Sequence, residues 1–216
     1  LLRLISELLD FRKIESGNVH IKVSARNLVD FCKQIFQSYL GLAEMKHIDY
    51  QFECAEESIE VYYDSSQLEK VFYNILSNAF KFTPNHGKIS FMIRKEIDKV
   101  EITITDTGIG IPLAMQDKIF TNFFQVKSGA IATEGWGIGL ALAKNIIDLH
   151  QGEISVYSEP TLETGFGLTA LTVKLRLGKM HFDARQIVED AVVRDVIKDL
   201  AIEDRVTVKA QLPENL

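Results

Sequence analysis

The chain has 216 residues, of which 46% are hydrophobic and 25% are charged, so it is long enough for one substantial α/β core with flanking pieces. Its formal net charge of −6 argues against broad electrostatic binding of nucleic acid, and no apolar run approaches the roughly 18 to 20 residues that cross a bilayer. There is no signal-peptide layout, and Cys32 and Cys54 lie in apolar segments at no metal-ligand spacing, so we expect a soluble, cytoplasmic chain with reduced core thiols.

Hydrophobic periodicity outlines the first half of the chain. Leu1, Leu4 and Leu8 follow helical spacing with no capping residue before them, so the sequence opens inside a helix. The period changes to two after Gly17 and to 3.6 again from Leu28, as expected for a strand followed by an amphipathic helix. The predicted elements are a helix over 1–16, a strand over 19–23, a helix over 28–39, strands over 48–54 and 59–63, and a helix over 65–82.

The second half opens with a hairpin and closes with a segment of different character. Two alternating stretches, 89–93 and 100–104, favour a β-hairpin. A glycine-rich stretch over 106–139 follows, with a short helix near Asp117 and, after Gln125, a loop long enough to be functional. The remaining predicted elements are a helix over 138–150, strands over 154–156 and 171–175, and, beyond Gly178, an amphipathic helix over 183–200 and a strand over 206–210 that carry no motif.

Three polar side chains share one face of the helix predicted over 65–82. Asn74, Asn78 and Lys81 stand at i, i+4 and i+7, away from the apolar stripe of that helix. Amide oxygens are suitable hard ligands for Mg²⁺, which also takes waters and substrate phosphates, and a lysine pairs with phosphate as a point charge. Taken alone, such residues are more often the solvated outer face of an amphipathic helix.

The second motif, Asp106-Thr107-Gly108-Ile109-Gly110, stands where an alternating strand runs into a turn. A carboxylate at this point can accept a hydrogen bond from the exocyclic amine of adenine, while Gly108 and Gly110 let the backbone approach a flat ring. An ordinary aspartate-glycine turn is one alternative. Another is the Asp-Thr-Gly triplet of aspartic proteases, whose mechanism needs two carboxylates that share a proton, so that a homodimer would supply the second.

The third motif, Gly135-Trp136-Gly137-Ile138-Gly139-Leu140, ends a loop and opens a helix, where free backbone N–H groups and the helix dipole favour phosphate. It is no Rossmann fingerprint, because the third small residue counted from Gly137 would fall at Leu142. The two Gly-Lys pairs of the chain lack the following hydroxyl residue of a P-loop. A flexible glycine hinge is the remaining alternative.

In this order the three motifs resemble the N, G1 and G2 boxes of sensor histidine kinases, and the resemblance covers most of the chain. Residues 74–83 are similar to the N box, 106–110 to the G1 box, 135–140 to the G2 box and 119–124 to the F box between them. That family belongs to an ATP-binding superfamily that also contains gyrase B, MutL and a heat-shock chaperone. The resemblance implies an α+β, Bergerat-type fold: a two-layer α/β sandwich whose mixed sheet is covered by helices on one face, with an ATP lid before the G2 box.

The resemblance also implies roles for individual residues. Asn78 would ligate Mg²⁺ with Asn74 supporting it, Lys81 would meet phosphate, and Asp106 would accept the adenine amine. The other residues expected around the nucleotide are Gly108 and Gly110 of the G1 box, Lys127 of the lid, and Gly135, Gly137, Gly139 and Leu140 of the G2 box.

Residues 8–17 match the exit from the dimerisation hairpin of the family. The expected division is therefore 1–16 as part of that hairpin, 17–178 as the ATP-binding catalytic domain, and 179–216 as an unassigned extension or linker. None of the five histidines has the context of the family's phosphoacceptor, which would lie upstream. Trp136 also departs from the small residue that the family usually has there.

The implied function is that of the catalytic part of a protein histidine kinase, which transfers the γ-phosphate of ATP, bound with Mg²⁺, to a histidine on the dimerisation hairpin for relay to a response regulator. The implied partners are that hairpin, the receiver domain and, at full length, a second copy of the chain, within the cytoplasmic part of a membrane-bound sensor. A nucleotide-binding regulatory module that transfers nothing is the alternative, and an acceptor motif upstream would favour the kinase.

Overall fold

A computed structural model of the chain describes residues 20–124, 137–160 and 167–188. It contains a five-stranded sheet in the order β2-β4-β5-β7-β6 and a separate two-stranded sheet of β1 and β3. β2 runs parallel to β4 and the other neighbours run antiparallel, so the large sheet is mixed. The strands are β1 Ser24–Asn27, β2 Asp49–Cys54, β3 Glu60–Tyr63, β4 Lys88–Lys95, β5 Lys99–Asp106, β6 Glu153–Glu159 and β7 Leu168–Arg176.

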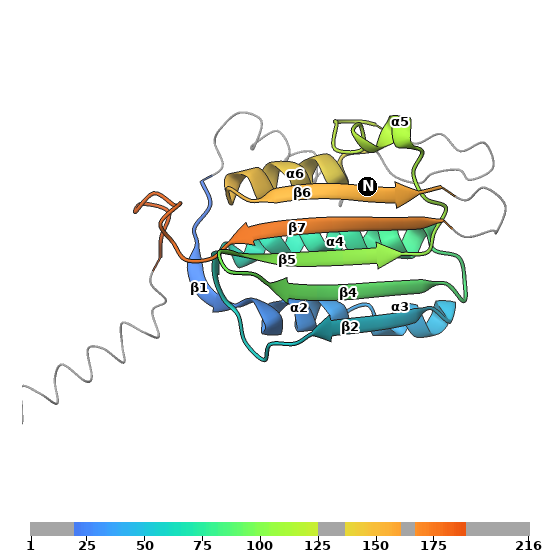
Figure 1. Cartoon of the computed structure of the whole chain (residues 1–216), viewed down its shortest axis with the longest axis horizontal. Coiled ribbons are helices and arrows are strands. Elements are labelled where there is room, and N and C mark those ends of the chain that lie inside the picture. The colour runs from blue at the N-terminus through green and yellow to red at the C-terminus, as the bar shows by residue number, and fades with distance from the viewer. Residues whose placement is uncertain (1–19, 125–136, 161–166, 189–216) are drawn as a thin grey trace, which may run out of the picture.

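The longer helices lie together behind the large sheet. In Figure 1, α2, α3, α4 and α6 cover one of its faces, while α5 lies near the end of β6. The result is a two-layer mixed α/β domain, which confirms the predicted fold class. The helices are α2 Leu28–Gln37, α3 Leu40–Lys46, α4 Ser65–Phe82, α5 Leu113–Gln116 and α6 Gly139–Leu149.

The core fills the space between the sheet and the helices. Alternate residues of β5 point toward the helices, so Val100, Ile102 and Ile104 are buried and Asp106 is the next residue in the same row. Each large side chain removed from water in this layer contributes about 1.5–3 kcal/mol. The buried residues of α4 that face them are Leu68, Val71, Phe72, Ile75, Leu76, Ala79 and Phe80.

Both ends of α4 are set by local chemistry. The Asp64 side chain accepts hydrogen bonds from the backbone N–H groups of Ser66 and Gln67, which satisfies donors of the first turn. The helix stops before Thr83, whose extended backbone is the conformation favoured in front of Pro84. The observed helix, Ser65–Phe82, has the predicted bounds.

The helix predicted over 28–39 is α2, Leu28–Gln37, and a second helix, α3, follows it after two residues. α2 ends at Gln37, where the hydroxyl of Ser38 donates to the carbonyl of Ile35 at 2.6 Å, and α3 begins at Leu40. The sequence analysis did not predict α3. Its only buried residue is Ala43, so it lacks the apolar stripe that periodicity detects.

The strand predicted over 19–23 was misplaced. Ile21 and Val23 are buried, but β1 begins at Ser24, and Val23 forms only a single parallel bridge with Ile187. Ile21 and Val23 form a small separate cluster with Phe182. Their alternation reflects burial in this cluster and does not indicate a strand of a sheet.

The helix predicted over 183–200 was also wrong in the part that is described. Residues 183–188 form a turn and the bridge to Val23. The Asp183 carbonyl accepts the Gln186 N–H in a single turn, and Val188 N–H then donates to the Val23 carbonyl at 2.8 Å, so the backbone pairs with another segment instead of continuing as a helix. The predictions for 1–16, the loop after Gln125 and 206–210 lie outside the described residues.

Within the described ranges, no helix is long and apolar enough to cross a membrane. Both cysteines are free thiols, as predicted, and burial raises the pKa of Cys32 well above its usual value. No group of three or more metal-ligating His, Cys, Asp or Glu residues occurs in that part of the chain.

Candidate functional site

The predicted asparagines lie on α4 beside the start of α6. Asn74 and Asn78 are half-buried and Lys81 is exposed. Gly139, the first residue of α6, lies so close to Asn74 that a Cβ added at the glycine would be 2.9 Å from the Asn74 Oδ1. The structure therefore brings together the N-box and G2-box residues, which are 65 positions apart in the sequence.

Asp106 is the last residue of β5 and turns its side chain toward the helix layer. Only 7% of its surface is exposed. Burial raises its pKa to about 6, and the backbone N–H of Gly108, which donates to Oδ1 at 2.9 Å, opposes that rise. No other described residue donates a hydrogen bond to this carboxylate, so it retains acceptor capacity for a ligand.

The turn after Asp106 lies against the C-terminal end of α4. A Cβ at Gly108 would be 2.7 Å from Asp106 Oδ1 and 2.8 Å from the Phe82 carbonyl, so only glycine fits there without a shift. Gly110 adopts a φ of 69° and packs against the backbone of Glu159 at the end of β6. The predicted G1 glycines thus connect the strand ends of the sheet with the last turn of the N-box helix.

Three further buried polar side chains gather near Asp106, and the sequence analysis missed them. Thr169 of β7 is the strand partner of Asp106, and its hydroxyl lies 3.0 Å from that of Ser158 on β6. Gln116 of α5 donates to the carbonyls of Ile111 and Ser158. Thr169, Ser158 and Gln116 are all buried, so this end of the sheet carries a polar lining within an apolar core.

The G2 segment is described from Gly137 onward. Gly137 has a φ of 68°, and its carbonyl accepts the N–H of Phe123 at 2.9 Å, which ties the G2 glycine to the F-box segment. Among the residues that the structure describes, no side chain caps the N-terminus of α6 at Ile138, and first-turn N–H groups of this kind can bind an anion. Leu140 lies in this first turn, half-buried. Three predicted residues, Lys127, Gly135 and Trp136, lie outside the described residues.

Lys46 is a second omission of the sequence analysis. From the end of α3 its ammonium donates to the carbonyls of Phe80 and Thr83, the latter at 3.0 Å, at the negative end of α4. The buried hydroxyl of Thr83 has no hydrogen-bond partner in the described structure. The C-terminal end of the N-box helix is thus held from α3 while carrying an unsatisfied polar atom.

The aspartic protease alternative finds no support in this geometry. Its mechanism needs a second carboxylate against Asp106, and no acidic residue among those described shifts the pKa of Asp106. The asparagines and the uncapped helix would also have no role in such an enzyme.

The fold and the site define the class of this protein. The turn that follows the buried acceptor Asp106 and the start of α6 each lie against the amide-bearing helix α4. Residues 63–179, more than half of the chain, match the family of histidine kinase-, DNA gyrase B- and HSP90-like ATPases. The chain belongs to that family, as an ATP-binding catalytic domain of the histidine kinase type.

Curated relatives share this domain. The chain is 38% identical over 207 residues to Histidine kinase P4 of Formosa agariphila, which covers 94% of the chain and 15% of that protein. It is 36% identical over 162 residues to the alginate biosynthesis sensor protein KinB of Pseudomonas aeruginosa, covering 74% of the chain and 26% of KinB. The chain thus spans only a small part of the length of these relatives.

Solved structures share the fold. The nucleotide-free catalytic domain of histidine kinase ThkA superposes with a TM-score of 0.63 at 26% identity, over 73% of this chain and 97% of that one. A structure of ThkA in complex with the response regulator protein TrrA gives a TM-score of 0.64 at 20% identity, over 83% of this chain and 50% of that one, which shows the fold alone.

Proposed function

We propose that the chain binds Mg·ATP between α4, the turn after β5 and the start of α6, and presents its γ-phosphate to a histidine on a dimerisation hairpin. One observation carries the proposal: α4 contacts Gly139 at Asn74 and Gly108 at its last residue, Phe82, so two glycine motifs distant in sequence adjoin the helix that carries the third motif. The buried polar side chains around Asp106 would form the part of this site that recognises the base.

Asp106 would recognise the adenine base through a hydrogen bond. Its ionised carboxylate accepts the exocyclic amine of adenine while the N–H of Gly108 holds the other oxygen. Gly108 and Gly110 pack against the backbone of Phe82 and Glu159, so in this proposal they hold the turn that carries Asp106. At the opposite side, the α6 N-terminus, opened by Gly137 and Gly139 and including Leu140, would receive the phosphates, together with Lys81, Lys127 and Gly135.

Asn74 and Asn78 fit a hard cation. Their amide oxygens are neutral, and no carboxylate or histidine cluster for a metal occurs in the described part of the chain, so a cation here would draw most of its charge compensation from the nucleotide phosphates. Bound in this way, Mg²⁺ would neutralise charge on the phosphates. In this proposal α4 holds Asn78 toward the phosphates, and Asn74, which packs against Gly139, supports it.

The implied partners follow from the same proposal. Residues 1–16 would continue a dimerisation hairpin that pairs with a second copy and carries the acceptor upstream, 17–178 would be the catalytic domain, and 179–216 would link to a following module. The response regulator complex of ThkA supports a receiver domain as the final acceptor. The cytoplasmic side of a membrane-bound sensor is the setting that we propose for the domain.

A transfer assay tests this function. The chain is incubated with γ-labelled Mg·ATP and the dimerisation hairpin of the same protein, in which the acceptor histidine is intact or replaced. We expect acid-labile label on the intact hairpin only, and its loss with Asn78→Ala. Binding of nucleotide without any transfer would overturn the kinase in favour of a regulatory nucleotide-binding module, and no binding would overturn both.

A further inference from the structure

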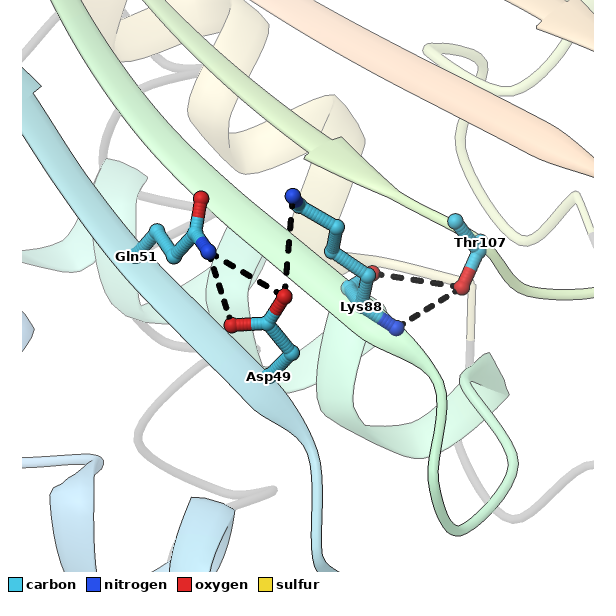
Figure 2. A network of polar contacts seen from close by, with 4 residues as sticks. All are labelled: Asp49, Gln51, Lys88 and Thr107. Carbon is cyan, nitrogen blue, oxygen red and sulfur yellow. Dashed lines mark hydrogen bonds and ion pairs between the residues drawn. The ribbon is translucent and has the colours of Figure 1, made fainter.

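Thr107, the residue between the buried Asp106 and Gly108, makes contacts that the ATP-site proposal does not use. Its N–H donates to the Lys88 carbonyl at 3.0 Å, and its hydroxyl oxygen accepts the Lys88 N–H at 2.8 Å. Figure 2 shows both atoms of Lys88 facing the Thr107 hydroxyl. The residue is therefore bound to β4 by its backbone and by its side chain at once.

The side chain takes a place that a backbone carbonyl normally holds. In an antiparallel ladder, a hydrogen-bonded pair exchanges two N–H to carbonyl bonds. Here the second acceptor is the Thr107 hydroxyl, one residue after the last regular pair of Asp106 with Ile89. The Thr107 carbonyl is thereby released from the ladder, and the chain leaves the sheet directly after Asp106.

The departure at this residue sets the turn that holds the Asp106 carboxylate. Gly108 N–H binds Asp106 Oδ1 at 2.9 Å, and Gly108 packs on the Phe82 carbonyl at the end of α4. Had the ladder continued by one backbone bond, Thr107 and Gly108 would follow the direction of β5, away from this contact. The direction of the remaining carboxylate oxygen therefore depends on where the ladder stops.

The partner of Thr107 is itself fixed. The Lys88 ammonium lies 3.5 Å from Asp49 Oδ2, and Gln51 donates to the same carboxylate (Figure 2). These groups are about half exposed, so their ion pair adds little stability. The Gly87 carbonyl also accepts the Asp49 N–H at 2.9 Å, so the backbone at the start of β4 is paired with β2.

We propose that Thr107 is a positioning residue for nucleotide recognition: its hydroxyl replaces its own carbonyl as the acceptor of Lys88 N–H and so ends the β4–β5 ladder where Asp106 faces the base. This inference rests on the proposed ATP site. Thr107 contacts no nucleotide in it, and its effect is on the direction of Asp106, and hence on the choice of base.

The test compares variants that lose a threonine hydroxyl directly after β5 or within it. Thr107→Val removes the acceptor, Thr107→Ser retains it, and Thr103→Val is the matched control, because Thr103 lies on β5 four residues earlier and its hydroxyl bonds that of Thr172 across the sheet, at 3.1 Å. Affinities for Mg·ATP and Mg·ITP, whose base has an oxo group in place of the amine, are measured by calorimetry on folded protein.

We expect Thr107→Val to lower the affinity for Mg·ATP by about fivefold to tenfold, the worth of one hydrogen bond, and to reduce the preference for ATP over ITP by a similar factor. Thr107→Ser should retain the preference and Thr103→Val should not change it. An unchanged preference in Thr107→Val, or an equal change in Thr103→Val, would overturn this inference while leaving the ATP site intact.

Two other outcomes are informative. If the unmodified chain binds neither nucleotide, the proposed ATP site fails and this inference fails with it. If Thr107→Val does not fold, amide exchange of Gly108 in Thr107→Ala and Thr107→Ser gives the answer: faster exchange in the alanine variant alone supports positioning of the turn, and equal exchange overturns it.

Discussion

The two ends of α4 carry opposite kinds of chemistry. At the N-terminal end, Asp64 caps the helix, and its own N–H donates to the Nε2 of His150 at 3.1 Å, while the other ring nitrogen of His150 bonds the Ile146 carbonyl. Lys22 N–H binds the second Asp64 oxygen at 3.0 Å. Each polar group named here has a partner, and the histidine is 1% exposed.

At the C-terminal end, polar groups are buried without full compensation. The Asp106 carboxylate has one protein donor and a raised pKa, and the Thr83 hydroxyl has no partner among the described residues. Such groups cost free energy in the unliganded chain, which is typical of residues retained for binding. One end of the helix therefore stabilises the domain through satisfied polar groups, whereas the other end retains polar groups that a ligand could pair with.

The largest effect is expected at the glycine that joins Asp106 to α4. Gly108→Ala would place a methyl group 2.7 Å from Asp106 Oδ1 and 2.8 Å from the Phe82 carbonyl, so the turn must move. We expect a loss of about 2–3 kcal/mol in unfolding free energy, as for overpacking, and loss of nucleotide binding in calorimetry.

Gly41→Ala is the matched control, because a Cβ there meets nothing within 4 Å and the residue lies in α3. It should leave binding unchanged and stabilise the chain by up to about 1 kcal/mol. Equal behaviour of the two alanine variants would show that the turn after Asp106 is not tightly packed.

The N-terminal end of α4 is tested by removing the histidine that pairs with it. His150→Leu would leave the Asp64 N–H buried without an acceptor, and we expect a loss of about 2 kcal/mol in urea unfolding at pH 8 with little change in nucleotide affinity. His20→Leu, at an exposed position, serves as the control. A loss of affinity larger than the loss of stability would contradict the division between the two ends.

The same histidine makes stability depend on pH. Burial lowers the pKa of His150 in the folded chain below its ordinary value of 6.5. Between the folded pKa and 6.5, the unfolded chain therefore binds more protons than the folded chain. Its contribution is fully present above pH 6.5 and is lost as the pH falls toward the folded pKa. Urea unfolding from pH 8 to 5 should show this decline, and His150→Gln, which stays neutral, should flatten it.

A smaller effect is expected at Lys46 of α3, which binds carbonyls at the C-terminal end of α4. Lys46→Met retains the apolar stem but removes the donor to the carbonyls of Phe80 and Thr83, for an expected loss of about 1–1.5 kcal/mol in unfolding free energy. Lys33→Met, at an exposed position of α2, should cost less than about 0.5 kcal/mol. Equal losses would show that the cap contributes nothing.

The affinity for nucleotide should itself vary with pH, because it depends on the protonation of Asp106. An ionised carboxylate accepts the adenine amine more strongly than a protonated carboxyl does, and burial raises the pKa of Asp106 to about 6, so the affinity for Mg·ATP should fall as the pH drops below this value. Calorimetric titrations at pH 7.5 and 5.5 would measure the change, and an affinity independent of pH would contradict an ionised Asp106 as the acceptor.

The sequence predicted the elements whose burial pattern is regular. The bounds of α4 were predicted because Asp64, Pro84 and an apolar stripe mark them, and the β4–β5 hairpin follows from its alternation. It did not predict α3, whose only buried residue is Ala43, or the true place of β1, because burial under Phe182 produces the same alternation as a strand.

The candidate site was predicted where its residues stand in motifs. Asp106, Gly108 and Gly139 carry spacing that chemistry can interpret, whereas Lys46, Ser158 and Thr169 stand in ordinary segments and reach the site only through tertiary contacts. No local pattern distinguishes a capping lysine from a solvated one. Only the alignment of Asp106 with Thr169 across β5 and β7 identifies the polar lining.

The most direct test is Asp106→Asn, measured for stability and for binding together. The amide can still accept Gly108 N–H but is never charged, and a pKa raised from 3.8 to about 6 corresponds to about 3 kcal/mol of cost at neutral pH as an upper value. Between those two pH values the folded chain binds more protons, so this cost grows as the pH rises through the interval and is complete above about 6.

At pH 7.5 we predict that Asp106→Asn raises the unfolding free energy by about 1–3 kcal/mol and weakens Mg·AMPPNP binding at least about tenfold, because its Nδ2 cannot accept the adenine amine. Asp148→Asn, at an exposed α6 position, should change neither quantity appreciably. Lower stability in Asp106→Asn, or binding as tight as in the unmodified chain, would contradict an aspartate held at this end of the sheet for the nucleotide.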